Sequence, residues 1–327
     1  MEAREFFRSL IGAVAVCLTA SAASAQTVAG PETLSWGTNP FSLTLGDEVF
    51  PATTEYRFEK AQRVFVESMS GIGDELFDIA SFPLRDPMTF GAYALGVAAL
   101  TLVDRPTTML YQEYVAPIGT RINPPHLIDT SQFGFLPNIS KDEQYLAAGL
   151  IGSYAYGIAA NDERAQVAAL LSTKAVAYSF VTSHVLLKAG FGRMRPVPDL
   201  KGHRGPTGDY STSPFDWFQS TGFHIDSETH GTAMPSFHFT MYFSTARIYS
   251  GVYDNYLIPY GLAALLAIQS AEGHNHWTSD MVAGALIGTG IGNVILNNYE
   301  ERKLGPSGTV FPIVSSQGAG LGFQMNF

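Results

Sequence analysis

Cysteine is nearly absent from this chain of 327 residues, which contains one, Cys17. Cys17 lies in a stretch that has the features of a secretory signal: Arg4 and Arg8 precede an apolar run over 10–20, and Ala23-Ser24-Ala25 fits a cleavage site. Cleavage near Ala25 would remove the cysteine, which excludes disulfides and thiolate catalysis in the mature chain. The expected location is the periplasm or the outside of the cell, and the lack of disulfides favours a bacterial periplasm.

Charge is also scarce, because Asp, Glu, Lys and Arg make up 15% of the residues and hydrophobic residues make up 46%. The 29 acidic residues outnumber the 19 basic ones and give a net charge of −10. This balance excludes nucleic acid as a partner on bulk electrostatics. Because the negative net charge of the chain repels anions, an anionic ligand would need a local pocket of basic residues.

Strand patterns are rare before the C-terminus, and helical periodicity dominates. We expect an all-α helical bundle with a six-helix core and a short C-terminal β-hairpin over 310–314 and 321–327 that packs on the bundle. The expected parts are a signal peptide at 1–25, an arm at 26–52, a helical domain at 53–300 and a tail with the hairpin at 301–327. Helices are predicted over 53–80, 86–102 (buried), 106–118, 140–160, 163–189, 236–249, 255–271 and 277–298.

Several of these helices are apolar on every side, which raises the possibility of a membrane protein. Each is short or interrupted by glycine and polar residues, so a soluble bundle is preferred over a polytopic membrane protein. Peripheral contact with a membrane is left open.

Three polar groups interrupt the apolar helices. Lys188 and Arg195 lie around a helix end, where a compact ammonium and a planar guanidinium suit a phosphate. Ser236 and His238 open a helix, whose first N–H groups can bind an anion. His276 and Asp280 are four residues apart, so a helix would place the carboxylate one turn from the imidazole. Taken alone, each group also fits ordinary helix capping or a surface histidine.

Taken together and in this order, the three groups resemble the motifs of the type 2 phosphatidic acid phosphatase family. Vanadium-dependent haloperoxidases and bacterial class A acid phosphatases share its superfamily. The resemblance covers 188–280 and rests on a lysine followed after six residues by Arg-Pro, a Pro-Ser-x-His sequence and a histidine followed after three residues by aspartate.

The resemblance implies a role for each matching residue. Lys188 and Arg195 would bind the phosphate together with Ser236. His238 would protonate the leaving group, and His276 would be the nucleophile, oriented by Asp280. The implied reaction proceeds through a phosphohistidine without a metal or another cofactor.

Two positions depart from the family pattern. Phe237 stands where the family usually has glycine, and its ring is expected near the pocket mouth with Trp277. Ser270 stands where the family has a phosphate-binding arginine, a loss that should cost about 1.5–3 kcal/mol of binding. Arg193, His203 and Arg204 are the candidates to replace that arginine, whereas Arg247 is expected to point away.

The leading expectation is a phosphatase that hydrolyses a phosphorylated small molecule or lipid. The absent arginine also fits a degenerate member that binds a phosphate or lipid without turnover. A third alternative is a haloperoxidase that uses vanadate as its cofactor. The remaining histidines, including His224, His230 and His274, lack the tight spacing of metal ligands, so no metal site is expected.

Overall fold

The computed structural model describes residues 43–51, 53–122, 124–128, 140–202, 205–220, 222–223, 229–270, 275–305, 307–315 and 318–326. The predicted signal peptide and most of the arm lie outside the described residues. So do His203 and Arg204, the candidates to replace the family arginine, and two of the histidines considered for a metal, His224 and His274.

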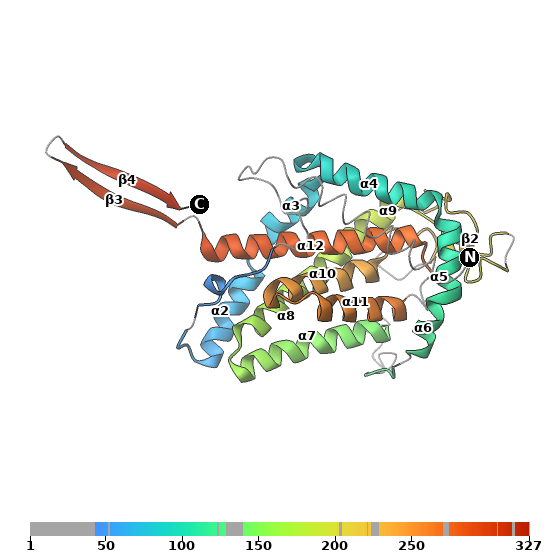
Figure 1. Ribbon diagram of the computed structural model, residues 1–327, viewed down its shortest axis with the longest axis horizontal. Coiled ribbons are helices and arrows are strands. Elements are labelled where there is room, and N and C mark those ends of the chain that lie inside the picture. The colour runs from blue at the N-terminus through green and yellow to red at the C-terminus, as the bar shows by residue number, and fades with distance from the viewer. Residues whose placement is uncertain are drawn as a thin grey trace.

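The described chain is mostly helical, as predicted, and its helices pack side by side (Figure 1). A capping box opens the helix predicted over 140–160, because the Ser140 N–H donates to the Glu143 carboxylate over 2.9 Å. The helices are α2 (Arg57–Met69), α3 (Ile72–Arg85), α4 (Pro87–Leu102), α5 (Asp104–Tyr114), α6 (Ala116–Arg121), α7 (Lys141–Ala160), α8 (Glu163–Ser179), the π-helical η3 (Phe180–Leu187), α9 (Lys188–Phe191), α10 (Phe237–Tyr253), α11 (Leu257–Ser270) and α12 (Thr278–Leu304), with a short 3-10 turn η1 (Asp47–Val49).

Two helix predictions differ from the structure. The helix predicted over 53–80 is divided into α2 and α3 at Gly71, whose φ of 74° belongs to the left-handed region that glycine adopts readily. The prediction that 86–102 is buried is wrong: Met88 is 83% exposed and Leu95 73% exposed. A uniformly apolar helix carries no polar face from which its buried side could be read.

The core lies where α8, α10 and α12 meet, around the buried side chains of Val167, Ile248 and Ile295. Two glycines bring α10 and α12 into backbone contact. A Cβ at Gly288 would lie 2.2 Å from the carbonyl oxygen of Thr240, and one at Gly284 would lie 2.5 Å from that of Ser236. This close packing places the first turn of α10 beside the first turns of α12.

Two small sheets complete the fold. A parallel pair, β1 (Arg195–Pro196) and β2 (Tyr210–Ser211), lies in the long loop after α9. The predicted hairpin is present as β3 (Ser307–Ser315) and β4 (Gly318–Asn326), which pair antiparallel. Figure 1 shows it extending beyond the end of α12. The expectation that the hairpin packs on the bundle is therefore wrong.

Two helical stretches are long and apolar enough to cross a membrane by length and composition, Glu163–Phe191 and Thr278–Leu304. A third candidate arises if the bent pair of Pro87–Leu102 and Asp104–Arg121 is counted as one span. Within the bundle, 50% of the first apolar window and 72% of the second are buried. Part of the apolar surface of each stretch is thus buried in the core of the bundle.

Candidate active site

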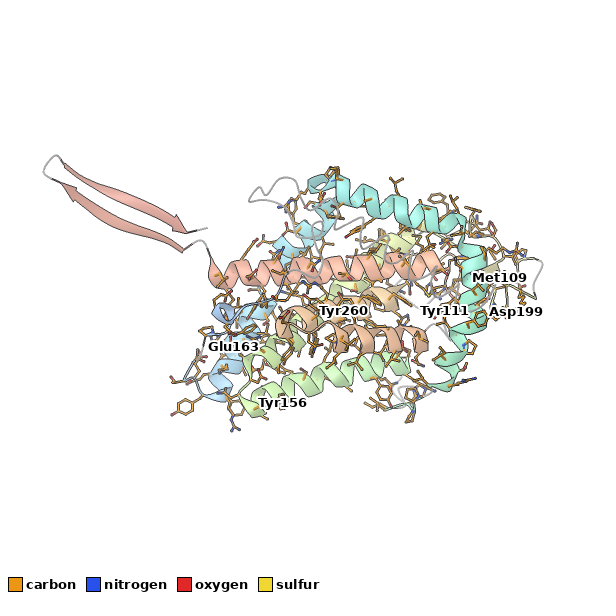
Figure 2. The ribbon with its side chains drawn as sticks, in the orientation of Figure 1. Met109, Tyr111, Tyr156, Glu163, Asp199 and Tyr260 are labelled. Carbon is orange, nitrogen blue, oxygen red and sulfur yellow. The ribbon has the colours of Figure 1, made fainter. Side chains whose placement is uncertain are left out.

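The three polar groups predicted from the sequence meet at one end of the bundle. α9 ends there, and α10 and α12 begin there beside α5. Figure 2 marks this end by Met109 and Tyr111 on α5 and by Asp199 in the neighbouring loop, whereas Tyr156 and Glu163 mark the opposite end. We call the following residues the polar cluster: Lys188, Arg195, Ser236, His238, His276 and Asp280.

Lys188 and Arg195 are both buried, with 3% and 6% of their surface exposed. Burial and the charge of Arg195 hold the pKa of Lys188 well below its ordinary value, although Asp280 offsets part of the effect. Burial lowers the pKa of Arg195 to about 10. Arg195 donates to the hydroxyl of Thr232 over 3.2 Å. Within the described ranges, neither side chain forms a direct ion pair, and Lys188 Nζ lies 3.2 Å from His184 Nδ1. An anionic ligand bound between Lys188 and Arg195 would favour the charged form of both.

Ser236 is the N-cap residue of α10 and is fully buried. Its N–H donates to the carbonyl oxygen of Asp280 over 3.0 Å, which joins the starts of α10 and α12. Its hydroxyl has no hydrogen-bond partner among the described residues. A buried hydroxyl at a helix N-terminus is suited to an oxyanion, since the first backbone N–H groups point the same way.

His238 lies in the first turn of α10 and faces two carboxylates of α7. Its Nε2 atom is 3.4 Å from Glu143 Oε1 and 3.9 Å from Asp142 Oδ2. Burial raises the pKa of Glu143, but the hydrogen bond and positive charge of His238 outweigh it and lower that pKa to about 2. Glu143, which caps the start of α7, is thus also a charged neighbour of the proton donor predicted from the resemblance.

His276 is 7% exposed, and its Nδ1 atom lies 3.7 Å from Asp280 Oδ2. Burial and the charges of Arg195, Lys188 and His238 hold the pKa of His276 well below its ordinary value, while a backbone hydrogen bond with Ala233 acts in the opposite direction. The ring is therefore neutral at physiological pH. A neutral imidazole has the free lone pair that a nucleophile needs.

Asp280 is held mainly by Arg193. The guanidinium of Arg193 is completely buried, and it lies 2.6 Å from Asp280 Oδ1 and 2.6 Å from Asp104 Oδ2. Its face also covers the Trp217 ring at 4.5 Å. Arg193, predicted to bind the substrate, is thus already satisfied by two carboxylates. Asp104 was not predicted, and the signal that could have indicated it is an acidic residue directly after a long apolar helix.

Of the two aromatic residues expected at the pocket mouth, Phe237 is partly buried and Trp277 does not reach the surface. Trp277 is fully buried and donates from its indole to the carbonyl oxygen of Met194 over 2.9 Å. The Phe237 ring packs against those of His184 and Phe180, at 5.6 and 5.9 Å between centroids. Both aromatic rings therefore belong to the walls around the cluster.

Ser270 is 5% exposed, and its hydroxyl donates to the carbonyl oxygen of Ala267. Arg247 points away from the cluster, as predicted, because it binds Asn293 and the carbonyl oxygen of Leu43. Of the arginines considered that the structure describes, neither Arg193 nor Arg247 offers a free guanidinium in place of the family arginine. No group of three His, Cys, Asp or Glu side chains that could hold a metal is found among the described residues.

The comparisons with known proteins agree with this geometry. The family described as the PAP2 superfamily matches residues 166–304. That range contains the whole polar cluster and the helices α10, α11 and α12. No curated protein and no solved structure matches the chain. Together with the motifs and the helical fold, this match supports membership of the PAP2 superfamily, whose members are generally phosphatases.

Proposed function

We propose that this protein is a phosphatase that hydrolyses a phosphomonoester through a phosphohistidine. The observation that carries the proposal is the environment of His276, a neutral imidazole buried beside two cations that have no carboxylate partner of their own among the described residues. Family membership supports phosphatase chemistry in general, and the cluster supports this particular route.

In the first step, the phosphate binds to Lys188, Arg195 and the start of α10. His276 attacks phosphorus through Nε2, because Nδ1 faces Asp280. A nitrogen–phosphorus bond forms and the bond from phosphorus to the ester oxygen breaks. His238 transfers its proton to the departing oxygen, and Glu143 stabilises the cationic ring before the transfer. The buried cations and helix N–H groups stabilise the charge on the phosphoryl oxygens.

In the second step, water attacks the phosphohistidine. The neutral His238 ring accepts a proton from that water, and the nitrogen–phosphorus bond breaks to release inorganic phosphate. His276 returns to its neutral form and His238 to its cationic form. The net reaction consumes one water and gives an alcohol and phosphate.

Asp280 stabilises the positive charge that His276 acquires when it attacks phosphorus. Arg193 acts on this step as a positioning residue, because it fixes the Asp280 carboxylate from the side opposite the imidazole. The substrate-binding role predicted for Arg193 is replaced in this proposal by support of Asp280.

The signal-like first 25 residues support a reaction in the periplasm or outside the cell. Exposed apolar side chains on α4 and α11, such as Leu95 at 73% and Leu257 at 84%, support peripheral contact with a membrane.

The test uses purified mature protein and a chromogenic phosphomonoester without added metal. We expect turnover that is lost in His276→Ala and retained in the control His230→Ala, whose ring lies in the loop beside Asp209. Quenching a reaction with ³²P-labelled substrate in an alkaline denaturant should leave a label on His276 that is stable in base and lost in acid.

Two other results would replace the proposal. Anion binding without hydrolysis of any phosphoester would favour a degenerate binding protein, which the serine at position 270 makes the main competitor. Oxidation of halide that appears only with vanadate would favour a haloperoxidase, with Lys188 and Arg195 holding vanadate in place of phosphate.

A further inference from the structure

The ammonium group of Lys188 has a neighbour that the proposed reaction does not use. Its Nζ atom lies 3.2 Å from Nδ1 of His184, and both side chains are buried. The two residues are four positions apart in continuous helical structure, so they share one face. His184 belongs to the π-helical segment η3, and such segments occur often at functional sites.

The direction of this hydrogen bond is fixed once a phosphate is bound. A phosphate beside Lys188 favours the charged form of that side chain, and an ammonium can only donate. His184 Nδ1 must then accept, which requires a neutral imidazole with its proton on Nε2. One of the three ammonium hydrogens therefore points to His184, and two remain for the phosphate oxygens.

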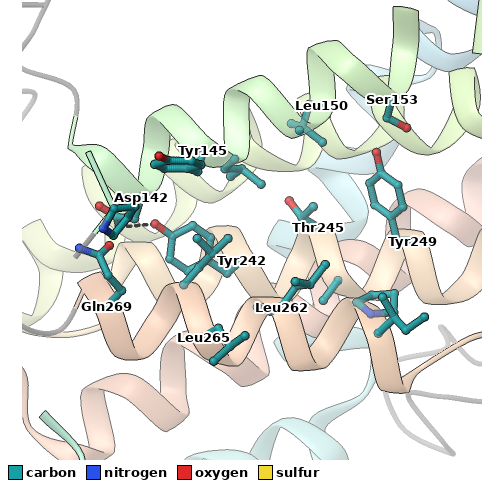
Figure 3. A pocket seen from close by; sticks show the side chains of 18 of the residues that line it. Asp142, Tyr145, Leu150, Ser153, Tyr242, Thr245, Tyr249, Leu262, Leu265 and Gln269 are labelled. Atoms are coloured by element: carbon teal, nitrogen blue, oxygen red, sulfur yellow. Dashed lines mark hydrogen bonds between the residues drawn. The ribbon is translucent and has the colours of Figure 1, made fainter. Parts of the chain in front are cut away.

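His184 holds the ammonium without cancelling its charge. The two carboxylates at the start of α7 have other partners. Glu143 lies 3.4 Å from His238 Nε2. Asp142 accepts from the Tyr242 hydroxyl in the wall of the cavity between α7, α10 and α11 (Figure 3). A carboxylate in place of the imidazole would neutralise the ammonium and repel a phosphate, whereas a neutral acceptor orients the ammonium and leaves its charge to the ligand.

Two aromatic rings hold His184 in turn. The Phe180 ring stacks on the imidazole at 5.0 Å between centroids, with 17° between the planes. The Phe237 ring meets the imidazole edge to face at 5.6 Å, and it meets Phe180 in the same way at 5.9 Å. Such contacts stabilise aromatic side chains beyond the burial of their area. The imidazole therefore cannot turn away from Lys188 without breaking this group of three rings.

The segment that carries His184 is also joined to the start of α10. The Ser183 hydroxyl donates to Thr240 Oγ1 over 2.9 Å, and the Thr240 hydroxyl donates to the carbonyl oxygen of Ser236 over 3.0 Å. Phe237 directly follows Ser236, so its ring and these hydroxyls join η3 to the same turn of α10. Glycine, which the family usually has at this position, could not make the ring contact.

From these observations we propose that His184 is a positioning residue for phosphate binding, which orients the Lys188 ammonium toward the ligand and is itself held by the Phe237 ring. The inference rests on the proposed phosphatase function and deepens it, because it gives a role to two residues outside the polar cluster. A lysine that is already ordered loses less side-chain entropy when it binds a phosphate. This gain offsets part of the contact that is lost because Ser270 replaces the family arginine.

The first experiment compares His184→Leu with His184→Asn. Both substitutions remove the stacked ring and leave side chains of similar size, but asparagine keeps an oxygen near the position of Nδ1 that can accept from the ammonium. We expect KM for a chromogenic phosphomonoester to rise about three- to tenfold in His184→Leu, the effect of one hydrogen bond, with little change in kcat. KM in His184→Asn should stay within about twofold of the wild type. Equal KM values in the two variants would overturn the proposal, because both lose the same packing.

The second experiment tests the link through Phe237 with a double-mutant cycle. Phe237→Leu keeps an apolar side chain but removes the ring edge that holds His184. We expect it to raise KM about two- to fivefold alone and to add nothing in combination with His184→Leu, since the acceptor that it positions is then gone. Effects that multiply in the double variant would reject the link. If His184→Leu does not fold, Phe237→Leu decides alone, and an unchanged KM rejects the proposal.

Failure of the proposed function can be told apart from failure of this inference. Calorimetry with inorganic phosphate measures binding and needs no turnover. Suppose that the wild type binds phosphate but hydrolyses no phosphoester. Affinity that falls in His184→Leu and recovers in His184→Asn would then refute the phosphatase and support the positioning role. Equal affinity in all three proteins would reject the positioning role, whether or not the wild type is a phosphatase.

Discussion

Arg193 joins Asp104 on α5 to Asp280 on α12, with 2.6 Å between its guanidinium and each carboxylate. All three side chains are completely buried. Burial raises the pKa of both carboxyls, and Arg193 opposes that rise. Ser279 strengthens the arrangement, because its N–H donates to Asp104 over 2.8 Å and its hydroxyl accepts from Arg193. The carboxylate proposed to support the nucleophile is thus fixed from a helix outside the polar cluster.

Replacing Arg193 by methionine should destabilise the protein by about 3–5 kcal/mol, because two carboxylates would remain buried without their cation. The free energy of unfolding, measured by urea denaturation, checks this expectation. Arg85→Met serves as the control, since Arg85 is 42% exposed and pairs with Asp78 at the surface. A loss below 1 kcal/mol in Arg193→Met would show that the network contributes little.

The milder change Asp104→Asn tests positioning rather than folding. Arg193 would then be drawn toward Asp280 alone, and the support that Asp280 gives to His276 would weaken. We expect kcat to fall by about tenfold with little change in KM, because the groups proposed to bind the phosphate remain. A rise in KM with an unchanged kcat would place Asp104 in substrate binding instead.

Lys188→Met should lower kcat/KM by about 10- to 100-fold, since one charge-assisted contact with the phosphate is lost. Lys201→Met is the matched control, because Lys201 is 69% exposed and pairs with Glu113 at the surface. Equal effects of the two substitutions would indicate general electrostatic attraction rather than a specific contact.

The acid side of the pH profile should reflect the environment of His276. Burial and the charges of Arg195 and Lys188 hold the pKa of His276 well below 6.5, so the nucleophile stays unprotonated at pH values where an exposed histidine is charged. We therefore expect kcat/KM to persist as the pH falls below 6.5. Lys188→Met removes one of these charges and should shift the acid limb to higher pH. An acid limb of the wild type centred near 6.5 would argue against His276 as the nucleophile.

Glu143 should make stability depend on pH in the acid range. Its folded pKa of about 2 lies below the ordinary value of 4.5, so its ionised form stabilises the fold above pH 4.5 and this contribution is lost as the pH falls toward 2. Glu143→Gln keeps a side chain that can still cap α7 but removes the charge. It should cost on the order of 1–3 kcal/mol at neutral pH and little near pH 2. A cost that is equal at both pH values would indicate a role in packing alone.

The sequence alone predicts the position of those helices whose first and last residues are typical capping residues. The helix predicted over 140–160 matches α7, since the capping residues Ser140 and Asn161 that bound it act locally. The helix containing Met88 and Leu95 was placed correctly but its burial was not. Burial depends on which neighbours pack against a helix, and an apolar helix gives no local indication of them.

The members of the polar cluster could be predicted because each lies at a helix end within a short motif. Their supports could not, because Asp104 lies far from the motifs along the chain and Thr232, although only four residues before Ser236, belongs to none of them. The carboxylate partners of Arg193 could not be predicted for the same reason. A cation near a phosphate motif indicates the ligand, and only the fold shows that two carboxylates have already neutralised it.

Gly288 lies on α12 two turns beyond Asp280, and it has no side chain to separate α12 from Thr240 on α10. The proposed proton donor lies in the first turn of α10, and the proposed nucleophile directly precedes α12. The distance between them therefore depends on the direct contact between the main chains of these two helices. Rotamer changes cannot widen it, and exchanges among the surrounding apolar residues leave it intact. The distance between the two proposed catalytic histidines thus depends on the absence of a side chain at Gly288, a position that belongs to no catalytic motif.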